Sequence, residues 1–156
     1  MKILDNLSPS RVKIGIESES KPDILRELLA VMLEQGVIED LDSVLEEFLE
    51  REAKGSTGIG NGIAIPHVRT AQVGQLEYLF ANCPEGLDFD SLDGEPVHIV
   101  LLMMAPKDSH GQHIKALAKV SRILNDETTR LRLARAGTAE EVCRIFEERE
   151  QEVEIR

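Results

Sequence analysis

The residues from Val97 to Met104 form a nearly continuous apolar run, and this run most constrains the fold. It has the length of one strand and is interrupted only by His98. A strand with so little polar alternation is typical of a sheet that is covered on both faces. We interpret His98 as a sheet histidine that faces polar neighbours or solvent. The rest of the chain must therefore cover both faces of this strand.

The other segments alternate between strand and helix patterns. Apolar alternation predicts strands at residues 12–16, 63–65 and 75–82. Helical spacing of apolar residues, with capping signals, predicts helices at residues 20–36, 43–52, 109–124, 127–135 and 138–150. This mixture predicts the α/β class, as a single-domain sandwich in which helices flank a mixed β-sheet. We expect residues 1–150 to form the domain and residues 151–156 to be a C-terminal tail.

Capping boxes and apolar stripes define the expected starts and faces of two helices. Ser109 with Gln112, and Thr138 with Glu141, have the spacing of capping boxes, so each pair predicts a helix start. In the helix after Ser109, we expect the inward face to consist of Ile114, Leu117, Ala118, Ser121 and Leu124.

The charge balance and the cysteine content limit the classes of partner. The 156 residues include 18 basic and 29 acidic ones, a net charge of −11. Binders of nucleic acids and of anionic membranes usually carry basic surfaces, so we expect no nucleic-acid partner. The longest apolar stretch is about half a membrane span, so we expect no direct membrane insertion. Cys83 and Cys143 suit neither a disulfide framework nor a zinc site, and fit a cytoplasmic location.

His67 is the histidine whose surroundings best suit chemistry. It follows a short strand and Pro66, beside a segment with glycines at positions 55, 58, 60 and 62. Glycines leave backbone amides open to a ligand or a partner. The segment lacks the Gly-Lys-Ser/Thr end of a Walker A loop and the order of a G-x-G-x-x-G loop. It therefore matches neither nucleotide-binding motif.

A second histidine and an arginine could complete an anion site. His113 falls in the first turn of a predicted helix, where free N–H groups attract anions; alternatively it is a surface residue near a cap. Arg51 precedes the glycines and is a candidate anion clamp, although an Arg51–Glu52 pair at a helix end is also typical of surface solvation. His110 and His113 have H-x-x-H spacing without a supporting acid or cysteine, so we expect no metal.

The sequence from Arg51 to His67 resembles the signature of a known family, the fructose/mannitol-type (type 2) enzyme IIA domain of the phosphoenolpyruvate-dependent phosphotransferase system. The resemblance includes Arg51-Glu52, the glycine segment and Ile63-Ala64-Ile65-Pro66-His67. The stretch His113-Ile114-x-x-Leu117-Ala118 resembles the family's second histidine and its helix. The resemblance extends roughly from residue 4 to residue 148.

The resemblance implies a histidine phosphocarrier, which is a phosphotransferase with a phosphohistidine intermediate. His67 would accept a phosphoryl group on Nε2, with its other ring nitrogen bonded to the backbone or to a side chain. Arg51 and His113 would supply positive electrostatics, and Ser56 or Thr57 and loop amides would support the phosphoryl group. The resemblance implies no metal and no organic cofactor.

The resemblance leaves the partners and the branch of the family open. Phospho-HPr or its nitrogen-branch equivalent would be the donor, and a permease domain or a regulatory protein would act downstream. A free-standing chain favours the nitrogen-regulatory branch, in which the position of Arg69 is often basic. The alternatives are a sugar-specific subunit that feeds a separate fructose/mannitol-type permease, and a non-catalytic regulatory binding module. Val68 replaces the small residue usual after the histidine and could narrow partner access.

One basic segment interrupts the acidic sequence. Residues 107–135 contain seven basic and three acidic residues. Taken alone, the pattern is typical of a solvated helix face. Because the segment contains His113, we also expect part of it to offset phosphoryl charge near His67.

Overall fold

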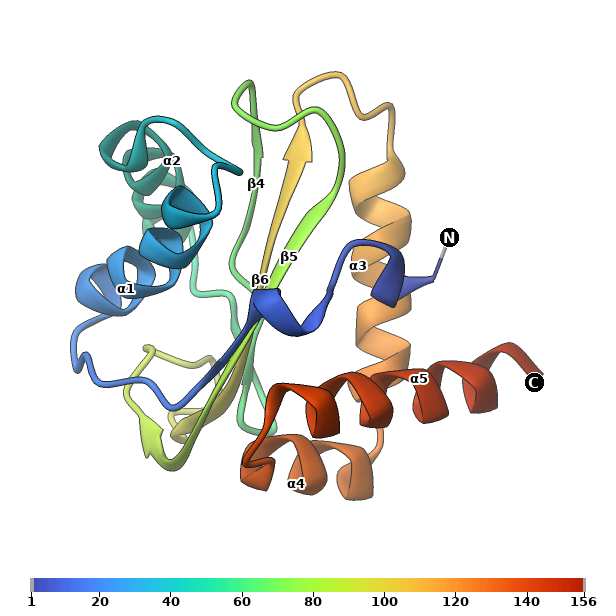
Figure 1. The fold of residues 1–156 in the computed structure, drawn as a ribbon. Helices are drawn as coiled ribbons and strands as arrows, with labels where there is room; N and C mark the ends of the chain where they lie inside the picture. Colours follow the sequence, from blue (N-terminus) through green and yellow to red (C-terminus); the bar gives the residue numbers. More distant parts are fainter. Residues whose placement is uncertain (1, 156) are drawn as a thin grey trace.

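The structure is a computed structural model that describes residues 2–155, with a central sheet between two layers of helices (Figure 1). The helices are α1 (Lys21–Glu34), α2 (Leu41–Ala53), α3 (Gln112–Leu124), α4 (Glu127–Arg135) and α5 (Ala139–Ile155), with short 3-10 helices η1 (Ile3–Asp5) and η2 (Pro9–Arg11). The strands are β1 (Val12–Ile14), β2 (Gly58–Gly60), β3 (Ile63–Ala64), β4 (His67–Thr70), β5 (Glu77–Leu87) and β6 (Val97–Pro106). This architecture confirms the predicted α/β sandwich.

The sheet is mixed, with the order β1-β5-β6-β3-β2, and β4 also pairs with β6. Strand β1 is parallel to β5, and both β3 and β4 are parallel to β6. The pairs β5–β6 and β2–β3 are antiparallel. Strand β6 therefore lies at the centre, as its apolar run predicted.

Strand β6 is buried on both faces, and its side chains alternate between two apolar clusters. Leu101 and Met103 join the cluster that contains the buried residues of α3 and α5. Leu102 and Met104 join the cluster formed with α1 and α2. In Figure 1, α1 and α2 lie on one side of the sheet, and α3, α4 and α5 on the other. The apolar run without polar alternation thus corresponds to a strand that is covered by helices on both faces of the sheet.

Pro66 divides one line of strand pairing into two short strands. Strand β3 pairs with Ile99 and Val100 of β6, and β4 pairs with residues 103–106. Pro66 has no N–H to donate, but its carbonyl oxygen accepts a hydrogen bond of 2.8 Å from the backbone N–H of Met103. We predicted that the strand ends at Pro66, and we did not predict that pairing resumes at His67.

The predicted capping box of α3 is wrong, and its inward face is only partly as predicted. The helix begins after Gly111, and the Ser109 hydroxyl is hydrogen-bonded to Nδ1 of His113 instead of capping the helix. Ile114, predicted to face inward, is 63% exposed. Of the predicted residues, Leu124 is buried and Leu117 is partly buried against the core, and the other buried residues are Ala116, Val120 and Ile123. Both stripes have helical spacing, and only packing against the sheet and α5 decides which one is buried.

The caps of two other helices agree with prediction, and some boundaries do not. The Ser20 hydroxyl accepts a hydrogen bond from Asp23 N–H at the start of α1, and Thr138 accepts one from Glu141 N–H at the start of α5. Helix α5 continues beyond its predicted end at residue 150. Strand β2 was not predicted, because its glycines resemble a loop.

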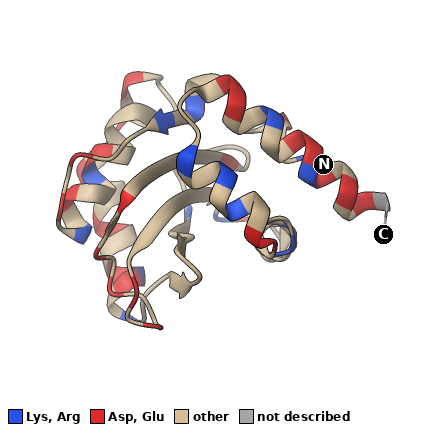
Figure 2. Cartoon of the chain, turned by 90° about the horizontal axis from the view of Figure 1, so that it is seen from below, with Lys and Arg blue, Asp and Glu red and all other residues tan. Residues whose placement is uncertain are grey.

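The helices differ in charge. Acidic residues recur along α5, the helix that ends beside the C label in Figure 2, whereas α4 carries three arginines. The basic residues of segment 107–135 are therefore spread over two helices and the loop before them. Within residues 2–155, no helix combines the length and apolar character that crossing a membrane requires.

Two isoleucines on α3 test which face of the helix is buried. Replacing the fully buried Ile123 with alanine should lower the free energy of unfolding by about 2–5 kcal/mol, because it leaves a cavity. The same replacement at the exposed Ile114 should change it by less than about 0.5 kcal/mol. Urea unfolding measures both values, and a larger loss at Ile114 would contradict the observed face.

Candidate functional site

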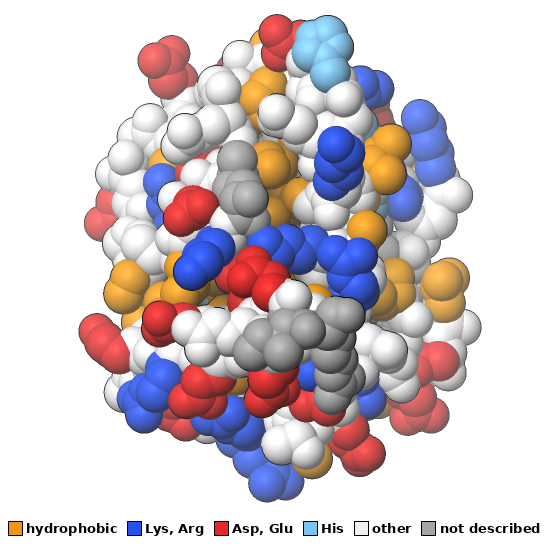
Figure 3. Space-filling view, turned by 90° about the vertical axis from the view of Figure 1, so that its right-hand side faces the viewer, with side chains coloured by type: hydrophobic (Ala, Val, Ile, Leu, Met, Phe, Trp, Pro, Cys, Tyr) orange, Lys and Arg blue, Asp and Glu red, His pale blue; other side chains and the backbone are white. Residues whose placement is uncertain are grey.

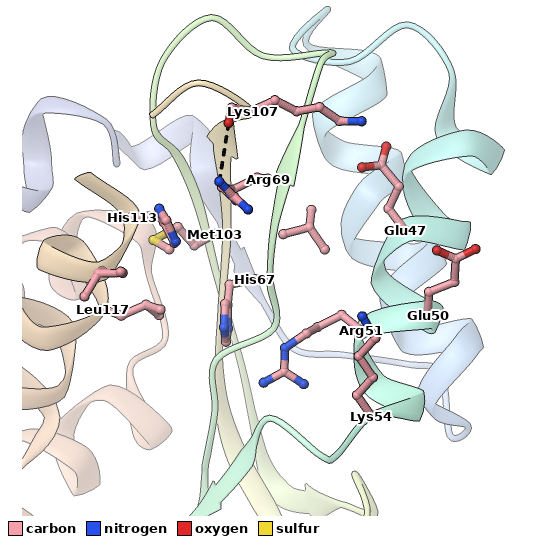
Figure 4. Close-up of a pocket in the computed structure, with 12 residues that line it drawn as sticks. Glu47, Glu50, Arg51, Lys54, His67, Arg69, Met103, Lys107, His113 and Leu117 are labelled. Atoms are coloured by element: carbon pink, nitrogen blue, oxygen red, sulfur yellow. Dashed lines mark hydrogen bonds between the residues drawn. The ribbon is translucent and has the colours of Figure 1, made fainter. Parts of the chain in front are cut away.

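A pocket of about 680 Å³ opens beside the start of β4, between α2 and α3 (Figure 4). It brings together the three residues predicted to be catalytic, which are His67, His113 and Arg51. They come from β4, α3 and α2, and Figure 4 shows His113 and Arg51 on opposite sides of His67. The remaining lining residues are Glu47, Glu50, Lys54, Val68, Arg69, Met103, Lys107, Ile114 and Leu117.

His67 is half-buried, and one of its ring nitrogens is held by the backbone. Its Nδ1 lies 2.7 Å from the carbonyl oxygen of Ile65. A carbonyl oxygen can only accept, so Nδ1 carries the proton and the neutral ring has its lone pair on Nε2. The expected hydrogen bond to one of the two ring nitrogens is therefore present, at Nδ1. A neutral imidazole with an available Nε2 can act as a nucleophile near pH 7.

His113 is held in the first turn of α3 by a buried serine. Its Nδ1 lies 3.0 Å from Oγ of Ser109, a residue that is 5% exposed. The bond limits rotation of the ring, so His113 presents a defined edge to the pocket. His110, its H-x-x-H partner in sequence, is exposed. Within residues 2–155, no three His, Cys, Asp or Glu side chains lie close enough together to hold a metal ion.

Arg51 is anchored to the loop that follows α2. Its Nη1 donates a hydrogen bond of 2.9 Å to the carbonyl oxygen of Gly55. In Figure 4 the side chain extends from α2 across the pocket towards His67. This placement suits an anion clamp, because the remaining guanidinium N–H groups can still donate.

Three further cations line the pocket, and two of them were missed. Lys54 lies three residues after Arg51, which places both on one side of the end of α2. Lys107 directly follows β6, and Nη1 of Arg69 donates to the Lys107 carbonyl oxygen at 3.5 Å. Helical spacing could have identified Lys54, but the β4–β6 pairing that places Lys107 is not visible in the sequence. Two acids, Glu47 and Glu50, also line the pocket, so it is predominantly but not uniformly positive.

The glycine segment and its two hydroxyl residues do not line this pocket. The Ser56 hydroxyl donates to the Phe89 carbonyl oxygen, and the Thr57 hydroxyl donates to the carboxylate of Glu52. Three of the four glycines, at positions 58, 60 and 62, form β2 and the turn to β3, where Gly60 has φ +101° and Gly62 has φ +76°. In this structure they shape a hairpin instead of presenting amides to the pocket, which corrects our expectation.

Glu52 is a buried carboxylate that organises the loop behind Arg51. It is 8% exposed and accepts hydrogen bonds from the backbone N–H and the hydroxyl of Thr57. It also accepts one from Nζ of Lys21, at 3.0 Å, and this ammonium lies over the ring of Phe89. The neighbours Arg51 and Glu52 therefore have opposite roles, one facing the pocket and the other facing inward. Neither is a simple surface charge.

Removing the charge of Glu52 should destabilise the protein. Glu52→Gln weakens the bonds to Thr57 and leaves the Lys21 ammonium without its buried partner, so we expect a loss of about 1–3 kcal/mol in the free energy of unfolding. The matched control is Glu50→Gln, two residues earlier and exposed, with an expected change within about 0.5 kcal/mol. Equal stabilities of the two variants in urea would contradict the structural role.

Comparison with known proteins shows one family. Residues 5–149 match the family described as "Phosphoenolpyruvate-dependent sugar phosphotransferase system, EIIA 2". A fructose-specific EIIABC component from Bacillus subtilis is 34% identical over 97% of this chain, and the chain spans 24% of that protein. A nitrogen regulatory protein from Bradyrhizobium diazoefficiens is 34% identical over 94% of this chain and 95% of its own length.

Solved structures share the fold over nearly the whole chain. Nitrogen regulatory protein IIA-Ntr from Neisseria meningitidis has a TM-score of 0.85 at 31% identity, covering 92% of this chain and 98% of that one. IIA mannitol from Escherichia coli has a TM-score of 0.76 at 23% identity, covering 90% of this chain and 98% of that one. The chain therefore belongs to the EIIA 2 family of the phosphoenolpyruvate-dependent sugar phosphotransferase system, a family of phosphotransfer proteins.

Proposed function

We propose that the protein is a histidine phosphocarrier in which Nε2 of His67 accepts a phosphoryl group from phospho-HPr or its nitrogen-branch equivalent. The observation that carries the proposal is the hydrogen bond between Nδ1 of His67 and the Ile65 carbonyl oxygen. It leaves the lone pair on Nε2, in a pocket lined by several cations. Membership of a phosphotransfer family supports the same reaction.

The proposed step needs only one bond to form and one to break. The Nε2 lone pair attacks phosphorus as the bond from phosphorus to the donor breaks, and the donor keeps the electron pair of that bond. The imidazole ring gains positive charge as it reacts. The Nδ1 proton remains hydrogen-bonded to the Ile65 carbonyl oxygen, which stabilises this charge. Transfer onward to an acceptor reverses the same step.

The basic residues of the pocket supply the electrostatic part of the proposal. Charge in the transition state spreads over three phosphoryl oxygens, and preorganised cations lower its energy most where water is excluded. Arg51 and His113 flank His67, while Lys54, Arg69 and Lys107 surround the site. The hydroxyls of residues 56 and 57 are hydrogen-bonded to Phe89 and Glu52. In this proposal they therefore support the site indirectly, by stabilising the loop whose Gly55 carbonyl oxygen anchors Arg51.

The output of the phosphocarrier is proposed to be regulation of a partner protein in the cytoplasm. Relatives named nitrogen regulatory proteins match over most of their own length, and Arg69 lines the pocket. A phosphoryl group adds up to about two negative charges, which alters docking on an already acidic surface without changing the fold. The alternative is a sugar-specific subunit, because relatives named fructose-specific match at similar identity. Both outputs share the His67 step.

Phosphorylation with purified components tests the proposal. The protein is incubated with phosphoenolpyruvate, enzyme I and HPr, and an acid-labile adduct of one phosphoryl group is expected on the wild type and absent from His67→Ala. Arg51→Gln should slow transfer by about 10- to 1,000-fold, because it removes one preorganised donor. Arg26→Gln removes an exposed arginine of α1 that pairs with Asp42, and should transfer normally. Labelling of His67→Ala would overturn the proposal.

The protonation of His67 provides a separate test that needs no partner protein. At a pH where the ring is neutral, nitrogen-15 NMR should show the proton on Nδ1 and an unprotonated Nε2, because Nδ1 donates to a carbonyl oxygen. A population with the proton mainly on Nε2 would contradict the hydrogen bond on which the reaction depends.

A further inference from the structure

A second pocket, of about 410 Å³, lies on the other side of α3 from His113. Residues 113, 114 and 117 of α3 line the first pocket, whereas residues 112, 115, 116, 119 and 122 line the second. At 100° per residue, these two sets occupy opposite faces of one helix. The wall facing α3 comes from Lys2 and Ile3, with Leu76 and Tyr78 beside them. Nothing in the phosphotransfer proposal uses this pocket.

The charged residues that line the second pocket are all basic. They are Lys2, Lys115, Lys119 and Arg122, in a chain of net charge −11. Lys119 pairs with Glu150 and Glu154. Within residues 2–155, the side chains of the other three form no ion pair. Figure 3 shows Lys and Arg side chains gathered across the middle of this face, with acidic side chains among and below them and apolar side chains exposed just above them.

This pocket accounts for part of the basic segment of residues 107–135. We expected part of that segment to offset charge near His67, and one of its seven basic residues, Lys107, lines the His67 pocket. Lys115, Lys119 and Arg122 line the second pocket instead. Lys2, Lys115 and Arg122, which form no ion pair within residues 2–155, repel one another around this pocket. A bound anion would relieve that repulsion.

The floor of the pocket is apolar and carries one hydroxyl group. Ile3, Leu76 and Tyr78 are each at most 5% exposed, and Ala116 completes the floor. Burial, together with the negative charge of Glu150, raises the pKa of Tyr78 to about 12, so its hydroxyl stays protonated and can donate. The Glu150 carboxylate accepts from the backbone N–H of Ile3, which holds η1 in place as a wall.

We propose that this pocket binds a small phosphate monoester that carries an apolar group. The apolar group covers the floor, and the phosphate lies among Lys2, Lys115 and Arg122. Several cations without ion-pair partners suit a dianionic phosphate better than a single negative charge. The volume falls within the range of pockets that enclose a small organic molecule.

The fluorescence of Tyr78 provides a direct measurement, because Tyr78 is the only tyrosine and the chain has no tryptophan. Hexyl phosphate is the probe, with methyl phosphate and hexanol as the anionic and apolar halves; none of the three absorbs where tyrosine does. We expect hexyl phosphate to change the emission saturably at millimolar concentrations and more weakly at high ionic strength. Methyl phosphate should bind more weakly, and hexanol should give no saturable change.

Charge-reversed variants locate the site. Lys115→Glu and Arg122→Glu should each weaken hexyl phosphate binding about tenfold or more, because each removes a charged contact and adds repulsion. Arg135→Glu makes the same charge change at an exposed position on α4 outside the pocket and should leave the affinity unchanged. Equal melting temperatures would show that all three variants are folded.

Three results would overturn the proposal. The first is no saturable change with wild-type protein, and the second is equal weakening in all three variants. The third is methyl phosphate binding as tightly as hexyl phosphate, which would leave no role for the apolar floor. None of these results bears on the phosphorylation of His67, so this proposal and the phosphocarrier proposal can fail independently.

Discussion

The pairing of β4 with β6 beyond Pro66 is the constraint on which the candidate site depends. Because proline cannot donate, the line of strands breaks there, and the Pro66 carbonyl oxygen is paired by Met103. The break places the Ile65 carbonyl oxygen where Nδ1 of His67 can reach it. In an uninterrupted strand, successive side chains would simply alternate between the two faces of the sheet, and the hydrogen bond from His67 to the Ile65 carbonyl oxygen would not form. One backbone interruption therefore orients the ring of His67, which lines the pocket, and selects the tautomer with its lone pair on Nε2.

The two walls around His67 are held by interactions outside the pocket. On one side, the buried Glu52 binds Thr57 and Lys21, and so maintains the loop whose carbonyl oxygen anchors Arg51. On the other side, the buried Ser109 holds the ring of His113. Supporting groups of this kind restrict the motion of functional side chains, which is a condition for electrostatic preorganisation.

Helix α3 contributes residues both to the candidate site and to the second pocket. Its buried stripe packs against the sheet and α5, and its remaining surface divides between the two pockets. Each exposed face combines cationic or histidine side chains with apolar ones. The charge of segment 107–135 is consequently distributed between different surfaces, which a count along the sequence could not separate.

The amino-acid sequence was sufficient to predict the sheet covered on both faces and, through its resemblance to a known family, three residues of the pocket, His67, His113 and Arg51. These predictions depend on local patterns: an apolar run without alternation, the contiguous motif from Arg51 to His67, and the short motif that begins at His113. Three features could be read only from the folded chain: which stripe of α3 is buried, the hairpin formed by glycines 58, 60 and 62, and the position of Lys107 in the pocket. These features depend on strand register and on helix packing between segments that are distant in the sequence. Several registers and packings agree equally well with the local sequence patterns, and only the contacts of the folded chain select one of them.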